Sequence, residues 1–478
     1  MTLPSTGNAA LDDAFSRFAN ERCLIRKDGT ALHYKDVAQI AYRQAQRLSE
    51  LGNKPGARVG LVLGHSEDHL TLYLACAMGG FVACPLDPSL PEARANAARS
   101  SLGISYVCSP ANAHEWNANP KATTTLKVPA ADAEFLIILS SGTTGAPKGI
   151  VHTLGSIVES AKAFSALSEF DATTVLYHHF PMHYMAGVFN MFFCALVSGA
   201  AIVVVERYDT GTMLRFWELP RKLGVNQLTL TPTMALSLSQ LYRRDDSLLS
   251  HIAGYRSIIS TSSTLYDSIA KRFHDTFQVP LRGCYGVTEV GGSITLQSWD
   301  QALARESVGA LSKGAVVEAG TDVEPGPILV KTPFMLKGYA AADGVTTGVD
   351  ARGFFPTGDL GYLQHGSLYV TGRSHDLVKR GGEFVALPLI ENLALRHAGV
   401  ASAAAVAVPD EYWGNKIVLF YVARPDADFD SVRLQLEAEL RASLRKIEVP
   451  DKFIPVPRMP TTSIGKTRKS ELLSTYTV

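Results

Sequence analysis

The sequence predicts an α/β protein of more than one domain, with a mainly parallel sheet early in the chain and a compact α+β domain at its end. Length and composition give the first reason, because 478 residues, 46% of them hydrophobic, supply enough apolar material for a large core. Alternation of helix-like and strand-like segments up to about residue 230 gives the second. Beyond Gly309 the chain changes to short strands and Gly/Pro turns, followed by a tail of about a hundred residues.

Helical and extended patterns alternate along the first half of the chain. Apolar periodicity indicates helices at about residues 35–51, 67–78, 156–167 and 213–223. Apolar or β-branched runs indicate strands at residues 56–63, 81–85, 135–139, 174–177 and 227–230, and later at 326–331 and 367–371. Strands separated by helices need crossover connections, so we expect most of the early strands to be parallel.

One apolar stretch, residues 185–205, is long enough to cross a bilayer. Asn190, Ser198 and Gly199 interrupt it, and the half after Gly199 is β-branched. We therefore expect a buried helix, a turn at Gly199 and a buried strand, with no membrane span.

Composition narrows the classes of partner and the compartment. The 45 Lys and Arg residues equal the 45 Asp and Glu residues, so bulk charge favours neither nucleic acid nor an anionic membrane. The six cysteines are scattered without a C-x-x-C pair, which favours reduced core residues in a cytoplasmic protein. The first residues lack a basic region followed by an apolar one, so no secretory signal is expected.

A glycine- and hydroxyl-rich loop follows the run at residues 135–139 and ends in a lysine. Its glycines let backbone N–H groups approach an anion, its hydroxyls donate hydrogen bonds, and the lysine adds a charge, as in a polyphosphate-binding loop. The Walker pattern is not met, because the lysine follows a proline and no Ser or Thr comes after it. A solvated turn is the alternative for any short piece of it. The residues assigned to the phosphates are Ser140, Ser141, Gly142, Thr143, Thr144, Gly145 and Lys148.

Residues 284–289 and 357–360 carry further groups that suit a nucleotide. Tyr285 offers a ring for a base, Thr288 a hydroxyl for a phosphate, and Glu289 a carboxylate for Mg²⁺. Asp359 lies on a T-G-D turn, where its carboxylate could accept two hydrogen bonds from a ribose diol. Taken alone, a strand-end turn and an Asx-turn are the alternatives.

Two basic residues complete the set. Arg373 suits a ribose or a phosphate, and a surface salt bridge is the alternative. Lys466 follows a glycine in a polar loop near the end of the chain. Gly-Lys-Thr at this place resembles a Walker ending, but the upstream glycine that a Walker loop requires is Pro460.

In this order the stretches resemble the motifs of the acyl-adenylate-forming superfamily, which contains acyl- and aryl-CoA synthetases, nonribosomal-peptide adenylation domains and luciferase. The resemblance covers nearly the whole chain through S-S-G-T-T-G-A-P-K-G, Y-G-V-T-E, T-G-D, G-R and the late G-K. It implies a large N-terminal domain of two sheet-and-helix lobes plus a β-rich piece, residues 1–373. A small mobile α+β domain, residues 374–478, would follow. ATP, Mg²⁺ and CoA are the implied cofactors.

The resemblance also implies a role for each motif residue of this chain. Lys148 and its loop would hold the β- and γ-phosphates of ATP, Thr288 the α-phosphate, Glu289 the Mg²⁺ and Asp359 the ribose. Lys466 would bridge the substrate carboxylate and the α-phosphate. The remaining nucleotide contacts would be Tyr285, Gly286 and Arg373. No general base is needed, because a carboxylate is already ionised at pH 7.

Three positions depart from the family pattern. Gly283 stands where many relatives have an asparagine or aspartate near the adenine. His375 stands at the expected hinge, where relatives usually have aspartate or lysine. Residues 261–265, Ser262 among them, stand where relatives have glycines. Their side chains would narrow the acid or adenine pocket or add hydroxyl groups to it.

Residues 180–187 resemble the P-x-x-H-x-x-G segment of acyl- and aryl-CoA ligases. The segment has no aspartate, which peptide-synthetase domains use to bind an α-ammonium group, so an α-amino acid is disfavoured. We expect His183, Met185, Gly187 and Ser262 to bind an aryl or short-to-medium aliphatic acid. A methionine and aromatic stripe is also common in plain core.

The sequence leaves the acceptor of the acyl group open. Lys379 and Gly382 match family positions near the pantetheine channel, which favours CoA and therefore an acid–CoA ligase. A carrier-protein thiol or an amine is the alternative acceptor, and a nucleotide-binding protein without catalysis is the alternative outside the enzymes. A homodimer is compatible with the sequence.

Overall fold

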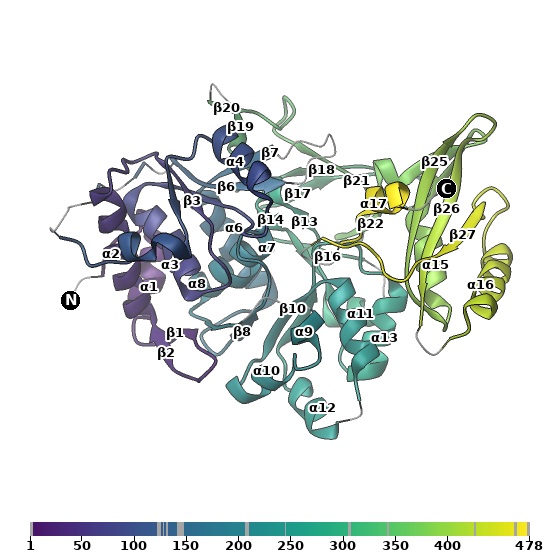
Figure 1. Ribbon diagram of the computed structural model, residues 1–478, viewed down its shortest axis with the longest axis horizontal. Coiled ribbons are helices and arrows are strands. Elements are labelled where there is room, and N and C mark those ends of the chain that lie inside the picture. The colour runs from purple at the N-terminus through teal and green to yellow at the C-terminus, as the bar shows by residue number, and fades with distance from the viewer. Residues whose placement is uncertain are drawn as a thin grey trace.

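The computed structural model describes residues 3–121, 126–127, 129–130, 132–140, 148–205, 210–243, 245–304, 307–341, 344–424, 427–462 and 466–475. Two seven-stranded sheets and one six-stranded sheet form a large N-terminal domain, and a three-stranded sheet with its own helices forms a C-terminal domain at one side of it (Figure 1). The predicted class, two sheet-and-helix lobes plus a β-rich piece and a small α+β domain, is confirmed.

The first lobe is a seven-stranded sheet with the order β20-β19-β7-β6-β4-β3-β5. Strands β3 to β6 are parallel to their neighbours in this group, whereas β7, β19 and β20 are antiparallel additions at one edge. The strands are β3 (Arg58–Leu61), β4 (Val82–Pro85), β5 (Tyr106–Cys108), β6 (Glu134–Ser140), β7 (Lys148–Thr153), β19 (Gly338–Ala341) and β20 (Gly344–Thr346). The helices of this part are α2 (Tyr34–Glu50), α3 (Glu67–Gly79), α4 (Glu92–Ser101) and α5 (Ala113–Trp116).

Helices α2 and α3 illustrate how the sequence forms this lobe. Val37, Ala41 and Leu48 recur at helical spacing on the buried face of α2, and the Asp36 carboxylate accepts a hydrogen bond of 2.9 Å from the backbone N–H of His33 at its start. Helix α3 packs on α2 and is buried on all sides over residues 69–79. A helix with no polar face has to be covered all round, so α3 fixes the centre of the largest core cluster.

The second lobe is a seven-stranded sheet with the order β12-β11-β10-β8-β9-β1-β2, parallel except for the pair β1 and β2. Its strands are β1 (Arg22–Ile25), β2 (Ala31–His33), β8 (Val175–His178), β9 (Ala201–Val204), β10 (Gln227–Leu230), β11 (Ser257–Ser260) and β12 (Arg282–Gly283). The other helices of this part are α1 (Ala9–Arg17), α7 (Met185–Val188), α8 (Cys194–Ser198), α9 (Thr210–Met213), α10 (Glu218–Leu223), α11 (Pro232–Leu241), α12 (Asp246–Ala253) and α13 (Asp267–Phe277). Helix α6 (Leu154–Ser168) contacts β6 and β7 of the first sheet and packs on α8.

The third sheet is antiparallel, with the order β15-β16-β22-β21-β18-β17. Its strands are β15 (Thr295–Leu296), β16 (Gly309–Leu311), β17 (Val316–Glu318), β18 (Gly326–Lys331), β21 (Phe355–Gln364) and β22 (Ser367–Arg373). Along the chain, β12 is followed by β13 (Gly286–Val287), the one-turn helix η3 (Thr288–Val290) and β14 (Gly292–Ser293). Helix α14 (Trp299–Ala304) comes between β15 and β16.

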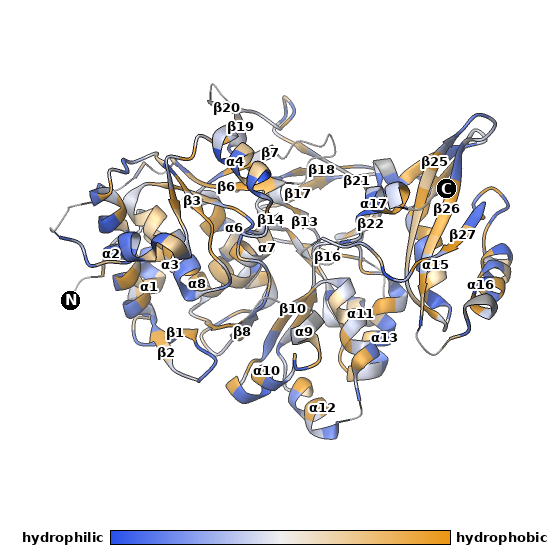
Figure 2. Cartoon of the chain, in the orientation of Figure 1, coloured by the Kyte–Doolittle hydropathy of each residue, from blue (hydrophilic) through white to orange (hydrophobic). Residues whose placement is uncertain are grey.

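The C-terminal domain has a core of its own, which includes Ile390, Leu419, Tyr421 and Leu436. In Figure 2 the sheet of this domain carries hydrophobic residues beside α15 and α16. The expected boundary between residues 373 and 374 falls between β22 and the short helix η4 (Ser374–Asp376), and it stays a prediction. The elements are β23 (Leu377–Arg380), β24 (Glu383–Ala386), α15 (Leu387–Arg396), β25 (Val400–Asp410), β26 (Gly414–Ala423), α16 (Phe429–Ser443), β27 (Lys452–Pro455) and α17 (Lys469–Thr475).

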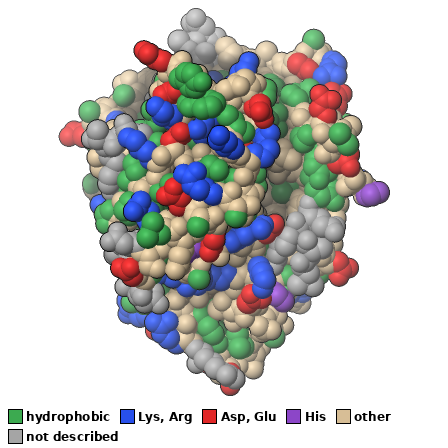
Figure 3. All heavy atoms as spheres, turned by 90° about the vertical axis from the view of Figure 1, so that its right-hand side faces the viewer, with side chains coloured by type: hydrophobic (Ala, Val, Ile, Leu, Met, Phe, Trp, Pro, Cys, Tyr) green, Lys and Arg blue, Asp and Glu red, His purple; other side chains and the backbone are tan. Residues whose placement is uncertain are grey.

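Polar side chains join the two domains. The Tyr266 hydroxyl donates a hydrogen bond to the Glu391 carboxylate, and Gln240 Nε2 donates one of 3.3 Å to the carbonyl of Ala401. Lys469 Nζ lies 2.9 Å from Glu391 Oε1 and so ties α17 to α15 near the same place. Seen from the side of the C-terminal domain, basic and acidic side chains are interspersed over the surface (Figure 3).

Most elements predicted from the sequence are confirmed. Helices α2, α3 and α6 and strand β10 begin and end within two residues of the predicted positions. The prediction of one helix over residues 213–223 is wrong, because α9 ends at Met213 and α10 begins at Glu218. Pro220 explains the break, since proline has no N–H to donate and is tolerated only in the first turn of a helix.

The apolar stretch from Met185 folds as the sequence predicts. Helix α7, a π-helical segment (Phe189–Phe193) and α8 run into Gly199, which has a φ of +78° and precedes the buried strand β9. Of the helices in the described part of the chain, none combines the length and the apolar character needed to cross a membrane. All six cysteines are free, and five of them are buried.

Gly199→Ala is expected to destabilise the protein by about 2–4 kcal/mol. A Cβ here would lie 2.6 Å from ring atoms of Phe18, so overpacking adds to the strain of a left-handed residue. Gly224→Ala is the matched control, because Gly224 has a φ of +68° but a Cβ added there would meet no atom within 4 Å. It should lose only about 1 kcal/mol. Urea unfolding measures both, and equal losses would contradict the packing argument.

Candidate active site

The nucleotide motifs come from all three large sheets of the N-terminal domain and from the small β13–β14 sheet. Residues 284–289 follow β12, Lys148 opens β7, and Asp359 and Arg373 lie on β21 and β22. Ser140 ends β6, and its side chain is outside what the structure describes. The other loop predictions that fall outside the described residues are Ser141, Gly142, Thr143, Thr144 and Gly145.

Asp359 is the best-anchored polar group of the site. It pairs with Arg373 across the β21–β22 ladder, and Arg373 Nε lies 3.0 Å from Asp359 Oδ1. The Tyr285 hydroxyl donates a hydrogen bond of 2.7 Å to Oδ2, and Asp359 is only 4% exposed. Burial and the neighbouring carboxylate raise the pKa of Tyr285, so its hydroxyl stays a donor. Three predicted residues therefore form one bonded group, in which each carboxylate oxygen keeps a lone pair for a ligand.

Glu289 forms a second group beside the first. Its Oε1 accepts a hydrogen bond of 3.2 Å from the Tyr339 hydroxyl, and Lys148 Nζ lies 5.4 Å from the centre of the Tyr339 ring. Burial raises the pKa of Glu289, and the charges of Arg373 and Lys148 partly oppose that rise. The structure thus brings Lys148, Glu289 and Arg373 within electrostatic reach of one another. Tyr339, which links two of them, carries no signal in the sequence.

His152 supports Thr288 and was also missed in the sequence. The ring is fully buried on β7, and its Nε2 donates a hydrogen bond of 2.9 Å to the backbone carbonyl of Thr288. Burial lowers the pKa of His152 to about 4, so the ring is neutral at pH 7. His152 is a polar residue next to the apolar residues Ile150 and Val151 of β7, and that position is the sequence signal that could have indicated its role.

Two glycines of this segment are required by their neighbours. A Cβ on Gly286 would lie 1.9 Å from the carbonyl oxygen of Gly292 on the paired strand β14. A Cβ on Gly283 would lie 2.9 Å from Gln297 Oε1, which accepts a hydrogen bond from the Gly283 N–H. Gln297 therefore occupies the space that a side chain at position 283 would need.

The predicted acid-binding residues divide between two segments. His183, Met185 and Gly187 lie together before and within α7, and His183 Nε2 is 3.6 Å from Asp87 Oδ2. A Cβ on Gly187 would lie 2.3 Å from the carbonyl oxygen of Pro181, so this turn needs glycine. Ser262 follows β11 on the other segment and has a φ of +77°, a conformation that non-glycine residues rarely adopt.

Two histidines that the sequence did not indicate, the buried His178 and the half-buried His65, lie beneath the acid segment. His178 Nε2 donates a hydrogen bond of 3.0 Å to the Gly187 carbonyl, and His65 Nε2 lies 2.8 Å from the Phe180 carbonyl oxygen. Burial, followed by the proximity of His65, lowers the pKa of His178 well below its usual value. The described residues contain no set of three or more His, Cys, Asp or Glu side chains arranged for a metal ion. We therefore interpret His178 as a neutral ring that supports the backbone of this segment, with His65 bonded to the same segment through the Phe180 carbonyl.

Comparison with known proteins assigns the chain to a family. The AMP-binding enzyme model matches residues 11–125 and 105–340, and the model of the AMP-binding enzyme C-terminal domain matches residues 389–466. The chain belongs to the AMP-binding enzyme family.

Its relatives include CoA ligases of different acids. A feruloyl-CoA synthase of an Amycolatopsis species is 26% identical over 96% of each chain. A sulfoacetate–CoA ligase of Cupriavidus necator is 28% identical over 74% of this chain and 69% of the relative. The solved o-succinylbenzoate CoA synthetase MenE from Bacillus subtilis, in complex with its acyl-adenylate intermediate, is 21% identical, covers 97% of each chain and has a TM-score of 0.84. That last likeness concerns the fold.

In this AMP-binding enzyme the predicted residues of the C-terminal domain lie before α17 and on the β23–β24 hairpin. Lys466 closes a turn, since its N–H donates a hydrogen bond of 3.1 Å to Thr462 Oγ1. Lys379 is exposed on β23, and Gly382, with a φ of +91°, lies at the tip of the β23–β24 hairpin. No hydrogen bond or ion pair between described residues joins any of these three to Asp359 or Glu289. His375 lies in η4, and its side chain is outside the described part.

Asp359→Ala is expected to raise the ATP concentration needed for half-maximal pyrophosphate exchange by roughly 10–150-fold. Hydrogen bonds to a charged group contribute about 1.5–3 kcal/mol, and the change also leaves Arg373 without its buried partner. Tyr285→Phe removes one donor and should show a smaller rise in the same direction. Asp322→Ala, an exposed aspartate of the same domain, is the control. An unchanged ATP dependence in Asp359→Ala would remove this residue from the nucleotide site.

Glu289→Gln is expected to unfold at a higher temperature than wild type at pH 7 while exchanging pyrophosphate more slowly. Because burial raises the folded-state pKa of Glu289 above its ordinary 4.5, ionisation of this carboxyl destabilises the fold. That penalty is complete above the folded-state pKa and absent below pH 4.5. The difference in Tm should therefore shrink as pH falls through that interval. Glu324→Gln, an exposed change, should show no such pH dependence, and a constant difference for Glu289→Gln would contradict the argument.

Proposed function

We propose that this AMP-binding enzyme is an acid–CoA ligase. A carboxylate oxygen of the acid attacks the α-phosphorus of ATP, the bond to the bridging oxygen breaks, and pyrophosphate leaves. The sulfur of CoA then attacks the carbonyl carbon of the acyl-adenylate, the thiol proton is lost, and AMP leaves. The observation that carries the proposal is the meeting of two carboxylates, the buried Asp359 and the half-buried Glu289, with the cations Lys148 and Arg373 at the junction of three large sheets.

The cations answer the main difficulty of the first step. Two anions, the acid and the triphosphate, repel each other, so catalysis needs positive charge placed where negative charge builds up. Lys148 at the start of β7 and Arg373 at the end of β22 are held by neighbouring groups in advance. Preorganised charges of this kind need no rearrangement during the reaction.

The Asp359 group suits the nucleoside. Its carboxylate would accept hydrogen bonds from the ribose hydroxyls, and Tyr285 would lie against the base. Arg373, bonded to the same carboxylate, would contact ribose or phosphate. Thr288, whose backbone is held by His152, would bind the α-phosphate.

Glu289 fits a site for Mg²⁺ that forms with the nucleotide. Mg²⁺ takes oxygen ligands and is often bound by one or two carboxylates plus the phosphates of a substrate. Glu289 is a half-buried carboxylate whose pKa is raised by burial, so a cation bound beside it would stabilise its charged form. When bound, Mg²⁺ would neutralise charge on the phosphates.

The relatives favour CoA as acceptor and leave the acid open. Both curated relatives named above are CoA ligases, yet one acts on an aromatic acid and the other on a small sulfonated one. We propose an aryl or short-to-medium aliphatic acid bound near His183, Met185, Gly187 and Ser262, with a carrier-protein thiol or an amine as the second candidate acceptor. The second step would turn the C-terminal domain about His375 and bring Lys379 and Gly382 to the nucleotide. A cytoplasmic location and a homodimer stay predictions.

Pyrophosphate release from ATP, measured over a panel of acids with and without CoA, tests the function. We expect release that depends on one group of acids, and an acyl-CoA that appears only when CoA is added. Release without thioester formation would favour the second candidate acceptor. No acid-dependent release from any panel member would count against an adenylating enzyme.

Lys466→Ala is expected to lower pyrophosphate exchange by on the order of 10²–10³-fold. Its ammonium group would stabilise charge on the α-phosphate only when the C-terminal domain closes over the nucleotide. The same variant should still convert supplied acyl-adenylate and CoA to thioester. Lys446→Ala, an exposed lysine of the same domain, is the control. Equal loss of both half-reactions would contradict a role confined to one domain orientation.

A further inference from the structure

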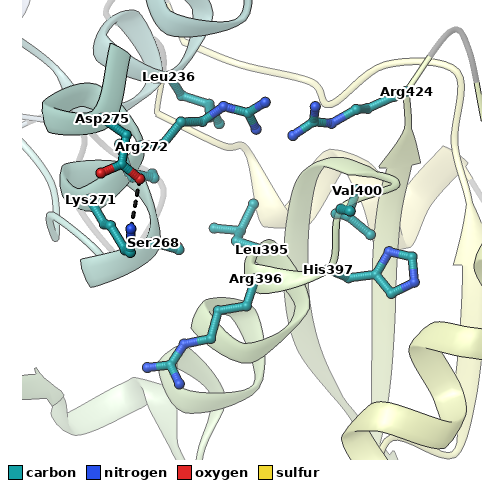
Figure 4. Close-up of a pocket in the computed structure, with 12 residues that line it drawn as sticks. Leu236, Ser268, Lys271, Arg272, Asp275, Leu395, Arg396, His397, Val400 and Arg424 are labelled. Carbon is teal, nitrogen blue, oxygen red and sulfur yellow. Dashed lines mark hydrogen bonds and ion pairs between the residues drawn. The ribbon is translucent and has the colours of Figure 1, made fainter. Parts of the chain in front are cut away.

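A cavity of about 400 Å³ lies between the two domains (Figure 4). Helices α11 and α13 of the N-terminal domain form one wall, and the end of α15, the start of β25 and the residue after β26 form the other. None of the described nucleotide-motif residues lines it, so it is separate from the candidate active site. Its volume lies in the range of small-molecule pockets.

Two arginines enter this cavity from opposite domains. Figure 4 shows the guanidinium group of Arg272, on α13, directed toward that of Arg424, which follows β26. Among the described residues neither side chain has an ion-pair partner, and Nε of Arg424 is buried without a hydrogen-bond acceptor. Most buried donors in proteins have an acceptor, so this arrangement leaves a place for one.

The other charged side chains that line the cavity in the described part of the chain do not supply that acceptor. Asp275, the one acidic side chain among the described residues that line the cavity, already binds Lys271 at 2.7 Å. Arg396 at the rim lies 4.0 Å from Asp267. Burial, and then the nearby charge of Arg424, lower the pKa of Arg272, as expected for two like charges that face each other. Among the described residues that line it, the cavity therefore carries more positive than negative charge in partly buried surroundings, where repulsion is weakly screened.

We propose that this cavity is an anion site for a small phosphate-bearing molecule, bound jointly by Arg272 and Arg424. Each guanidinium group can donate two parallel hydrogen bonds to phosphate oxygens, and a phosphate placed between them would relieve their repulsion. Leu236, Leu395 and Val400 add apolar side chains to the walls, so there is also room for an uncharged body. The phosphate could belong to inorganic pyrophosphate or to a nucleoside phosphate.

Such a ligand would stabilise the domain arrangement described here, because its two arginines come from different domains. A ligand that binds one arrangement more tightly than another shifts the population toward it. This regulatory consequence rests on the proposed function, in which the domains change their orientation between two half-reactions. The binding itself does not depend on that function.

Titration calorimetry on the full-length chain tests the site, with inorganic pyrophosphate in one arm and adenosine 3′,5′-bisphosphate in the other. Every protein carries Lys148→Ala to weaken phosphate binding at the active site, and no acid or CoA is present. We expect Arg272→Gln and Arg424→Gln each to weaken binding of at least one probe by about tenfold or more. Arg433→Gln, an exposed arginine on α16, should leave it unchanged.

Thermal unfolding shows whether the variants are folded. Their Tm values also measure how much the repulsion between Arg272 and Arg424 destabilises the protein. Without anion, Arg272→Gln and Arg424→Gln should unfold at the same or a higher temperature than their parent, because one of two facing charges is gone. The probe that binds should raise the Tm of the parent and of Arg433→Gln but not of the other two variants. Binding that is insensitive to both Arg272 and Arg424, or no binding of either probe, would overturn the proposal. Because no turnover is measured, this result is independent of whether the protein is a CoA ligase.

Discussion

The hydrogen-bonded group around Asp359 is the interaction on which the arrangement of the site depends. Its carboxylate joins the segment after β12, through Tyr285, to the paired strands β21 and β22, through Arg373. A buried carboxylate is stable only when hydrogen-bond donors surround it. The bonds among these three side chains therefore hold the second lobe and the third sheet in a fixed position relative to each other. Helix η3, which carries Thr288 and Glu289, begins three residues after Tyr285, so this bonded group also fixes the position of η3.

A second layer of uncharged groups supports the first. His152 reaches from β7 to the backbone of η3, Tyr339 reaches from β19 to Glu289, and Gln297 fills the space beside Gly283. Each comes from a different element, and each fixes a backbone or carboxylate that the chemistry would use. Burial keeps His152 neutral, so the support does not add charge to a site whose own charges are already closely placed. In this site the charged side chains would contact the nucleotide, and the uncharged side chains position them.

The sequence predicted the charged members of the site and missed the supporting ones, for a physical reason. Asp359, Arg373, Glu289 and Lys148 lie in short stretches whose residue types alone indicate phosphate or ribose binding, and the structure brings them together. Tyr339 and Gln297 make contacts with residues at large sequence separation, and an isolated tyrosine or glutamine has no pattern that reveals such a contact. The reverse holds for three residues whose motifs the sequence reveals but whose position relative to the nucleotide it does not: Lys466, Lys379 and Gly382. Their motif is evident, but their distance from the nucleotide site depends on the orientation of a whole domain, which local sequence does not determine.

The polar seam between the domains, where Tyr266 meets Glu391 and Gln240 meets the Ala401 carbonyl, has a thermodynamic consequence. Because the same groups can form hydrogen bonds with water, each of these bonds contributes only about 0.5–3 kcal/mol net, with the carboxylate bond at the upper end of that range. Relative populations of different domain orientations would then differ by only a few multiples of the thermal energy, and they would respond to ionic strength and temperature as well as to ligands. An apolar contact larger than the one that Leu395 makes with the core of the second lobe would have favoured one orientation more strongly and weakened all of these responses.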